Sequence, residues 1–253
     1  IWRNVLDAGA GVVLANKLPL CEVWSQSKPL FNHPRVRYEA TVGAGLPVLS
    51  TLRSLLGMGD AIARIDGALS GTLGFLSERL SAGALFSEAL AAAVALGYVE
   101  PDPSEDLSGR DVARKAVILS RTAGWPIELG DVDLEGLIPD QQVAEVKRGA
   151  IGAWIDDALK RRFEDASRDG EMLRYLTQVS PNGLRVGLTR VPASDPFAAI
   201  SGPENRVAFH TRRYSDYPLA ITGPGAGPEV TAAGVLADLI DLAEKHTANW
   251  ESS

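Results

Sequence analysis

The chain has 253 residues, of which 45% are hydrophobic and 23% charged, and this composition is typical of a globular protein with one large domain or two modest ones. The net charge of -7 argues against nucleic acid or anionic lipid as a partner, and no apolar stretch approaches the roughly 20 residues of a membrane-spanning helix. The single cysteine, Cys21, excludes a disulfide framework and a cysteine-cluster metal site, and it predicts a reducing compartment, by default the cytoplasm.

The N-terminal segment predicts a short helix over residues 1–8 and a buried strand over residues 12–14. Ala15, Asn16 and Lys17 follow that strand directly, at the edge where open α/β sheets bind ligands. The chain begins without a methionine and without a secretory signal, so we expect a truncated or processed start. A loop with several prolines then predicts a domain boundary near residue 35.

The middle of the chain predicts a helix after the glycine-rich segment 41–47, a strand over residues 61–69, and helices over residues 84–96 and 109–123. The second of these helices ends at Gly97, a common helix-ending residue. The side chains that the three helices should bury are Leu52, Leu55 and Leu56, then Phe86, Leu90 and Val94, then Val112, Ala116 and Leu119.

The last third of the chain predicts two charged surface helices over residues 132–170 and then a change to a period of two. Strands are expected over residues 173–179, 184–191 and 206–214, and the first two should form a hairpin with an Asn-Gly turn. A closing helix follows the loop 223–228, with an apolar face made of Leu236, Leu239, Ile240 and Ala243. This order predicts an α+β fold with a mainly antiparallel sheet.

Four glycine-rich loops invite comparison with the dinucleotide fingerprint G-x-G-x-x-G, and none matches its spacing and context. The loop at 223–228 still leads into a helix start, where unpaired backbone N–H groups can face an anion. It can touch a cofactor, or it can be a tight turn before the helix.

The acidic segment after Gly97 carries Glu100, Asp102, Glu105 and Asp106, stiffened by prolines at 101 and 103. Such a segment can hold an ammonium group or a divalent cation, and it can also be a solvated surface loop. The three histidines are too scattered to predict a metal triad or a Ser-His-Asp arrangement.

Two interpretations are open for the residues that follow the acidic segment. Ser108 and Asp111 form the S-x-x-D pattern of a helix start, which favours a capping role for Asp111. Lys115 lies four residues after Asp111, on the same helix face and beside the expected core row, so the pair should be partly enclosed. A lysine whose pKa is lowered by burial can donate a proton to a carbonyl oxygen, whereas a structural ion pair needs no such role.

Taken together, five segments in order along the chain resemble homoserine dehydrogenase. They are residues 15–17, 38–47, 67–72, 97–115 and 223–238, and the stretch from Glu100 to Lys115 is the most specific. The resemblance is to a monofunctional homoserine dehydrogenase or to the C-terminal part of a bifunctional aspartokinase/homoserine dehydrogenase. It implies interconversion of L-aspartate 4-semialdehyde and L-homoserine with NAD(P) as cofactor, in the biosynthesis of threonine, methionine and isoleucine.

The resemblance also implies roles for individual residues. Lys115 would be the proton donor, with Asp111 as the second catalytic residue. The substrate would be bound by Glu100, Asp106, Asp111, Lys17 and Thr72, and the cofactor by Lys17, Asn16, Gly225 and Ala226. A monovalent cation, Na⁺ in most members, would be held by Glu39, Val42, Ala44 and Leu46, largely through backbone carbonyls, and the protein would be a homodimer.

The same comparison predicts the domain organisation. Residues 1–35 would be the remnant of an α/β, Rossmann-like nucleotide-binding domain that lacks its N-terminal part. Residues 36–221 would bind substrate and form the dimer, and residues 222–253 would return to the nucleotide-binding domain. Two other functions stay open: a catalytically silent dimerisation fragment, and a metal-dependent hydrolase that uses the carboxylates at 100–106. NAD versus NADP preference and an attached aspartate kinase are not predicted.

Overall fold

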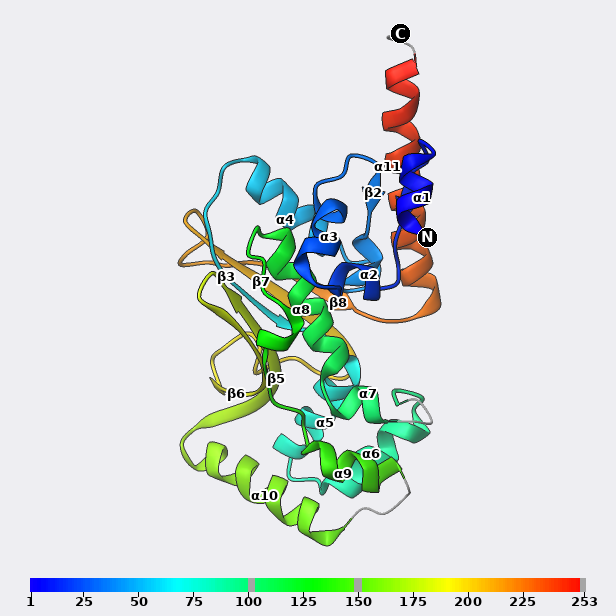
Figure 1. The fold of residues 1–253 in the computed structure, drawn as a ribbon. Helices are drawn as coiled ribbons and strands as arrows, with labels where there is room; N and C mark the ends of the chain where they lie inside the picture. The colour runs from blue at the N-terminus through cyan, green and yellow to red at the C-terminus, as the bar shows by residue number, and fades with distance from the viewer. Residues whose placement is uncertain (100–102, 148–151, 251–253) are drawn as a thin grey trace.

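The computed structural model describes residues 1–99, 103–147 and 152–250. One large, mainly antiparallel sheet is packed against helices, and a small parallel pair of strands lies beside the C-terminal helix (Figure 1). The α+β class with a mainly antiparallel sheet is therefore confirmed. The helices are α1 (Trp2–Asp7), α2 (Leu18–Cys21), α3 (Trp24–Phe31), η1 (Glu39–Thr41), α4 (Val48–Gly57), α5 (Gly71–Ser81), α6 (Phe86–Ala95), α7 (Ser104–Leu107), α8 (Arg110–Thr122), η2 (Leu129–Asp131), α9 (Asp140–Lys147), α10 (Ala153–Arg168) and α11 (Pro228–Trp250).

The large sheet has the strand order β4-β6-β5-β3-β7-β8. Its strands are β3 (Ile62–Ala68), β4 (Asp133–Leu134), β5 (Glu171–Ser180), β6 (Gly183–Pro192), β7 (Glu204–Thr211) and β8 (Leu219–Pro224). The predicted hairpin is confirmed as β5 and β6, but its loop consists of Pro181 and Asn182, while Gly183 pairs with Ser180. Asn182 does not have a positive φ, so the expected Asn-Gly turn type is wrong.

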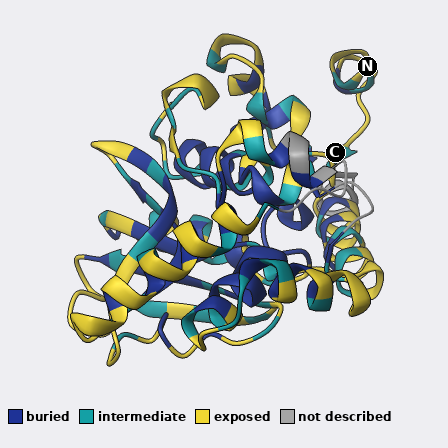
Figure 2. Cartoon of the chain, turned by 90° about the horizontal axis from the view of Figure 1, so that it is seen from below, coloured by how far each residue is buried: buried dark blue, intermediate teal, exposed yellow. Residues whose placement is uncertain are grey.

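Both faces of the large sheet carry hydrophobic side chains. Helices α5, α8 and α10 pack on β5, and α8 also contacts β6, which places the main core between these helices and the sheet. On the opposite face, Phe197 and Ile200 from the loop after β6 cover Ala68 and Leu176 in a second, smaller cluster. Buried residues gather in the middle of the molecule and exposed ones at its periphery (Figure 2).

Helix α5 was not expected from the sequence. It begins at Ser70, whose side-chain oxygen accepts a hydrogen bond from the backbone N–H of Leu73 at 3.2 Å. Most of its residues from Thr72 to Ser77 are buried, so the helix lacks the polar stripe by which an amphipathic helix is recognised.

Two of the expected apolar faces are wrong. In α6, Val94 is 56% exposed, whereas Ala89 and Ala93 are buried with Phe86 and Leu90. A row of residues spaced by four drifts by about 40° per step around a helix, so its third member leaves the buried face. In α11, Leu236, Leu239 and Ile240 are at least half exposed, and the buried side of the helix carries Asp238 and Leu242 instead. That side contacts η1 and the small parallel pair.

The small parallel pair consists of β1 (Val12–Val13) and β2 (Val36–Arg37), in the register Val12 to Val36. Helices α2 and α3 connect the two strands, and β1 is half-buried rather than buried. The domain limits at residues 35 and 221 stay a prediction. In the part of the chain that the structure describes, no helix is long and apolar enough to cross a membrane.

Candidate active site

A cavity of about 480 Å³ lies at the C-terminal edge of the β1 and β2 pair. Five segments meet there: the residues after β1, the segment after β2, helix α7, the first half of α8, and the loop between β8 and α11 with the first turn of α11 (Figure 1). The lining residues that the resemblance had singled out are Lys17, Ala44, Asp106, Asp111, Lys115, Gly225 and Ala226. The strand edge is therefore the place where ligand-binding residues gather, as expected for parallel strands.

Asp111 bridges two lysines at the wall of this cavity. Its Oδ1 lies 3.0 Å from Nζ of Lys17, and its Oδ2 lies 2.9 Å from Nζ of Lys115. The Lys115 ammonium also donates a hydrogen bond to the carbonyl oxygen of Leu69 at 2.7 Å. Lys17 comes from the segment after β1, and Leu69 directly follows β3, so the two lysines and Asp111 connect α8 to two other parts of the chain.

The expected helix cap is wrong. Helix α8 begins after Gly109, which takes a left-handed φ of 70°, and its first backbone N–H, of Arg110, donates to the Ser108 hydroxyl at 3.4 Å rather than to Asp111. A Cβ at this position would lie 2.0 Å from Oη of Tyr175, so glycine is required for space as well as for conformation. Because Asp111 is not used as a cap, its carboxylate is available to the two lysines.

The charges at this site shift each other's pKa. Burial opposes the ionised form of Asp111, but the ammonium groups of Lys115 and Lys17 outweigh it and lower the pKa of this carboxyl from 3.8 to about 2. Burial likewise lowers the pKa of Lys115, and the neighbouring Lys17 adds to this, while Asp111 acts in the opposite direction. Asp111 is therefore a permanent anion beside a lysine whose proton is easier to release than usual.

The acidic segment reaches the cavity only in part. Asp106 and Glu105 line it, and Oε2 of Glu105 lies 2.9 Å from Nη1 of Arg114, another lining residue. Glu105 and Arg114 were not singled out as site residues from the sequence. Glu100 lies outside the described residues, as do Pro101 and Asp102.

Two further predicted residues lie off the cavity wall. The hydroxyl of Thr72 donates a hydrogen bond to the carbonyl oxygen of Tyr98 at 2.5 Å, at the base of the acidic segment. Oδ1 of Asn16 accepts one from the backbone N–H of Leu18 at 2.9 Å, so this side chain fixes the start of α2. Neither residue is among those that line the cavity.

The glycine loop before α11 lines the cavity through Gly225, Ala226 and Gly227. A side chain at Gly225 has no room, because its Cβ would lie 1.9 Å from Cγ of Asn205. Asn205 is buried and was missed in the sequence, where it is one polar residue in a strand pattern. Only the pairing of β7 with β8 brings it to this loop.

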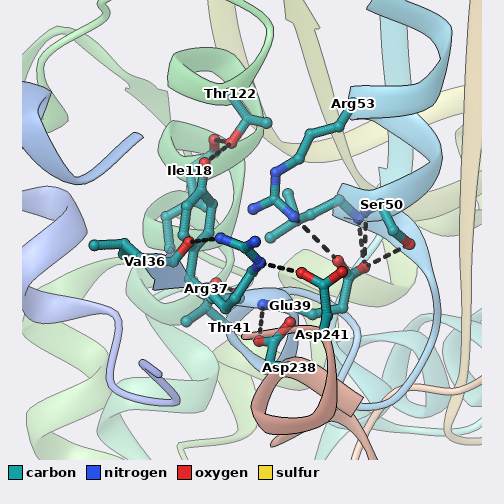
Figure 3. A network of polar contacts seen from close by, with 12 residues as sticks. Val36, Arg37, Glu39, Thr41, Ser50, Arg53, Ile118, Thr122, Asp238 and Asp241 are labelled. Atoms are coloured by element: carbon teal, nitrogen blue, oxygen red, sulfur yellow. Dashed lines mark hydrogen bonds and ion pairs between the residues drawn. The ribbon is translucent and has the colours of Figure 1, made fainter. Parts of the chain in front are cut away.

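The segment predicted to hold a cation reaches the cavity through Ala44. Figure 3 shows the polar contacts of Glu39, at the start of this segment. The Glu39 carboxylate accepts hydrogen bonds from the backbone N–H groups of Leu49 and Ser50 at 2.7 and 3.1 Å, so it caps the start of α4. Burial raises the pKa of Glu39 against these hydrogen bonds and against nearby Arg53. Its backbone N–H donates to Asp238 of α11 at 2.8 Å.

The residues after Glu39 turn sharply. Gly43 and Ala44 have φ of 79° and 55°, and within the described ranges Ala44 is the only non-glycine residue with positive φ. Leu46 accepts a hydrogen bond from the backbone N–H of Val48 at 2.7 Å, and Val42 is fully buried. Among the described residues there is no group of three or more His, Cys, Asp or Glu side chains that can hold a metal ion. A cation at this segment would therefore depend on backbone carbonyls.

A buried arginine connects α8 to the segment that carries Lys17. The Arg121 side chain is fully buried, and it donates hydrogen bonds to the carbonyl oxygens of Leu20, Glu22 and Ile127 and to the hydroxyl of Ser27. It also pairs with Glu128 at 2.7 Å. Nearby, burial raises the pKa of the Cys21 thiol to about 11, which leaves it protonated and unreactive.

The chain is similar to known proteins over most of its length. Residues 47–240 match the family model described as homoserine dehydrogenase. A bifunctional aspartokinase/homoserine dehydrogenase of Zea mays is 46% identical over 213 residues, which are 81% of this chain and 23% of that relative. A homoserine dehydrogenase of Emericella nidulans is 38% identical over 261 residues, covering 95% of this chain and 71% of the relative.

The fold leads to the same family. A solved hyperthermophilic archaeal homoserine dehydrogenase in complex with NADPH aligns with a TM-score of 0.71 at 27% identity, covering 95% of this chain and 66% of that one. The chain spans less than a quarter of the length of the bifunctional plant relative. From its family model and its relatives, the chain belongs to the homoserine dehydrogenase family.

Proposed function

We propose that this chain carries out the NAD(P)-dependent interconversion of L-aspartate 4-semialdehyde and L-homoserine, with Lys115 as the proton donor. The observation that carries the proposal is the Lys115 ammonium, held by Asp111 and the Leu69 carbonyl at the wall of the cavity. Among the described residues these two contacts use two of the three N–H groups of the ammonium, and the third can meet a substrate oxygen.

The lowered pKa of Lys115 supports a role as general acid. When bound, NAD(P)H supplies hydride to the aldehyde carbon, and the developing alkoxide takes its proton from Lys115. Asp111 stays ionised throughout, because its pKa is about 2. Its negative charge, shared with Lys17, keeps the Lys115 ammonium in place before transfer.

The acidic wall of the cavity supports binding of an amino-acid substrate. Asp106 lines the cavity on the side of α7, where its carboxylate can receive the substrate ammonium, with Asp111 nearby. We propose the same role for Glu100. Thr72 would contribute indirectly, because its hydroxyl holds the Tyr98 carbonyl just before that segment.

The residues present fit a nicotinamide cofactor. The loop at 225–227 lines the same cavity as Lys17 and has no large side chain there. It leads into the start of α11, where backbone N–H groups favour an anion. Lys17, Gly225 and Ala226 would hold the nicotinamide end, and Asn16 would position Lys17. The archaeal relative that binds NADPH supports this choice of cofactor.

We further propose a Na⁺ site at the turn after η1, with the backbone carbonyls of Val42, Ala44 and Leu46 as ligands and Glu39 behind them. The left-handed backbone at Ala44 supports it, because such turns redirect carbonyl groups. Replacing Na⁺ by tetramethylammonium at constant ionic strength should lower the melting temperature. An unchanged melting temperature after this exchange would contradict the site.

We also propose that the protein is a homodimer that acts in a reducing compartment. The single, inert Cys21 supports the second statement. Sedimentation velocity over a range of concentrations tests the first, and a monomer at all of them contradicts it.

The central experiment is NADPH-dependent reduction of L-aspartate 4-semialdehyde, followed at the NADPH absorbance, with this chain and with the complete product of its gene. Lys115→Ala should lower kcat by about 10²-fold or more. Lys160→Ala is the matched control, because Lys160 is exposed on α10 and faces only Glu164. Absence of turnover in both wild-type proteins would favour the silent dimerisation fragment. Unchanged kcat in Lys115→Ala with a lower melting temperature would favour the structural ion pair.

A further inference from the structure

Asn205 is a buried polar residue without a hydrogen-bond partner. It lies near the start of β7 and is 1% exposed, and within the described residues neither Oδ1 nor Nδ2 of its carboxamide has a partner. Buried carboxamides are nearly always hydrogen-bonded, since an unpaired one destabilises the fold. The carboxamide of Asn205 therefore does not stabilise the unliganded fold, and we look for a role in ligand binding.

The carboxamide packs on the loop that forms one wall of the active-site cavity. Asn205 pairs through its backbone with Gly223 of β8, and its side chain occupies the space where a Cβ of Gly225 would stand, 1.9 Å from Cγ and from Nδ2. Gly225 is thus bare on the side of Asn205 and lines the cavity together with Ala226. The position of this loop and the position of the carboxamide depend on each other.

The other neighbour of Asn205 in the sheet is the end of β3. Arg206 pairs with Ala68, so Asn205 lies beside the point where β3 continues into Leu69. The Leu69 carbonyl is the one that holds the Lys115 ammonium. The carboxamide therefore lies in the sheet between the support of the proposed proton donor and the glycine loop.

We propose that Asn205 is a positioning residue that fixes the loop at 223–227 for a nicotinamide dinucleotide, an inference that rests on the proposed function. A carboxamide offers one acceptor and a donor group, which match the N–H and C=O of a peptide unit. Binding of the dinucleotide would fix the loop in a position in which the peptide groups of the loop form hydrogen bonds with the Asn205 carboxamide. Because these hydrogen bonds form only in the bound state, they strengthen binding without a contact between Asn205 and the ligand.

The test is Asn205→Leu, which keeps the branched shape of the side chain and removes both polar atoms. The unliganded protein should melt at the same temperature or higher, because an unpaired buried group is lost. The Kd for NADPH, measured by fluorescence titration of the complete gene product, should rise about tenfold or more, the equivalent of one or two hydrogen bonds. The KM for NADPH should rise with it, and kcat at saturation should change less.

Thr177→Val is the matched control. Thr177 is fully buried on β5, its Oγ1 has no hydrogen-bond partner among the described residues, and it does not line the cavity. It should gain stability in the same way and leave the Kd for NADPH unchanged. If Asn205→Leu does not fold, Asn205→Ser removes the carboxamide with a smaller side chain, and the same rise in Kd is expected.

Three results would overturn the inference. The proposed role of the carboxamide is contradicted if either variant, Asn205→Leu or Asn205→Ser, folds and binds NADPH as tightly as the wild type. If the Asn205 variant melts at a lower temperature than the wild type, and its Kd for NADPH returns to the wild-type value on cooling, Asn205 has a structural role only. A wild-type protein that does not bind NADPH refutes the proposed function itself, and the inference with it.

Discussion

Asp111 and Lys115 owe their properties to their contacts rather than to their residue types. Each carboxylate oxygen of Asp111 faces a different ammonium group, at 3.0 and 2.9 Å. Burial lowers the pKa of Lys115, while Asp111 raises it and thereby limits the fall. Two measurable consequences follow, one for the rate and one for stability.

The first concerns the pH dependence of aldehyde reduction. The rate needs protonated Lys115, so kcat/KM should fall as the pH rises through its pKa, which lies below the ordinary 10.5. Asp111→Asn removes the anion that favours the ammonium form, so the alkaline limb of the profile should move to lower pH. Asp140→Asn is the control, since Asp140 is exposed and pairs only with Arg110. An alkaline limb in the same place for both variants would contradict the coupling.

The second concerns stability in acid. The pKa of Asp111 is about 2 in the folded protein, against 3.8 ordinarily. Its ionised form therefore stabilises the fold above about pH 4, and this contribution is lost as the pH falls through about 2. The difference in free energy of unfolding between wild type and Asp111→Asn, from urea titrations, should be constant near neutral pH and shrink below pH 4. A difference that grows on acidification would show that the lysines do not pair with Asp111.

At the scale of elements, α8 links the site to the N-terminal segment. Its first half carries Asp111 and Lys115, and its last turn carries Arg121, which binds the carbonyl groups of Leu20 and Glu22 around the end of α2. Since Lys17 immediately precedes α2, Arg121 helps to keep the Lys17 ammonium against Asp111. The arrangement of Lys17 and Asp111 thus depends on a buried side chain that does not line the cavity.

Arg121→Met should lower the free energy of unfolding by about 3 kcal/mol, because the carbonyl groups that it binds are left without a donor. Arg190→Met is the control: Arg190 forms ion pairs with Asp169 and Glu171, but it is exposed, and its removal should leave the melting temperature unchanged. Equal effects of the two substitutions in urea titrations would mean that the buried contacts contribute nothing.

At the scale of the whole molecule, α11 joins the end of the chain to the first strands. Gly234 lies against the turn at Ala44 and Gly45, Asp238 accepts the backbone N–H of Glu39, and Asp241 pairs with Arg37 at 2.5 Å (Figure 3). The helix therefore supports the cavity from behind, while its first turn lines it.

Gly234→Ala tests this close approach. Alanine normally stabilises a helix by about 1 kcal/mol relative to glycine. At Gly234, however, the new Cβ would lie 2.9 Å from the carbonyl oxygen of Ala44 and 3.3 Å from Cα of Gly45, so the substitution should lower the melting temperature. Gly57→Ala in α4 is the control, because nothing lies within 4 Å of its Cβ, and it should raise the melting temperature. A stabilising Gly234→Ala would show that α11 does not press on this turn.

Local sequence pattern was enough for most of the elements and for the family. The period-two stretches became β5, β6 and β7, and the i, i+4 spacing correctly placed Asp111 and Lys115 on one face of α8. The pattern failed for α5, whose surface is buried nearly all round, and for α11, whose apolar row is exposed. In both, the buried face depends on neighbours that periodicity does not describe.

The sequence by itself therefore determined the chemical groups of the site and the helix that carries two of them. Only the tertiary structure decided which groups meet: the Leu69 carbonyl on Lys115, Lys17 on Asp111, and Asn205 behind Gly225. The reason is physical. Hydrogen bonds and ion pairs act over a few ångströms, and the residues that come this close are separated along the chain by the strands and helices whose packing brings them together.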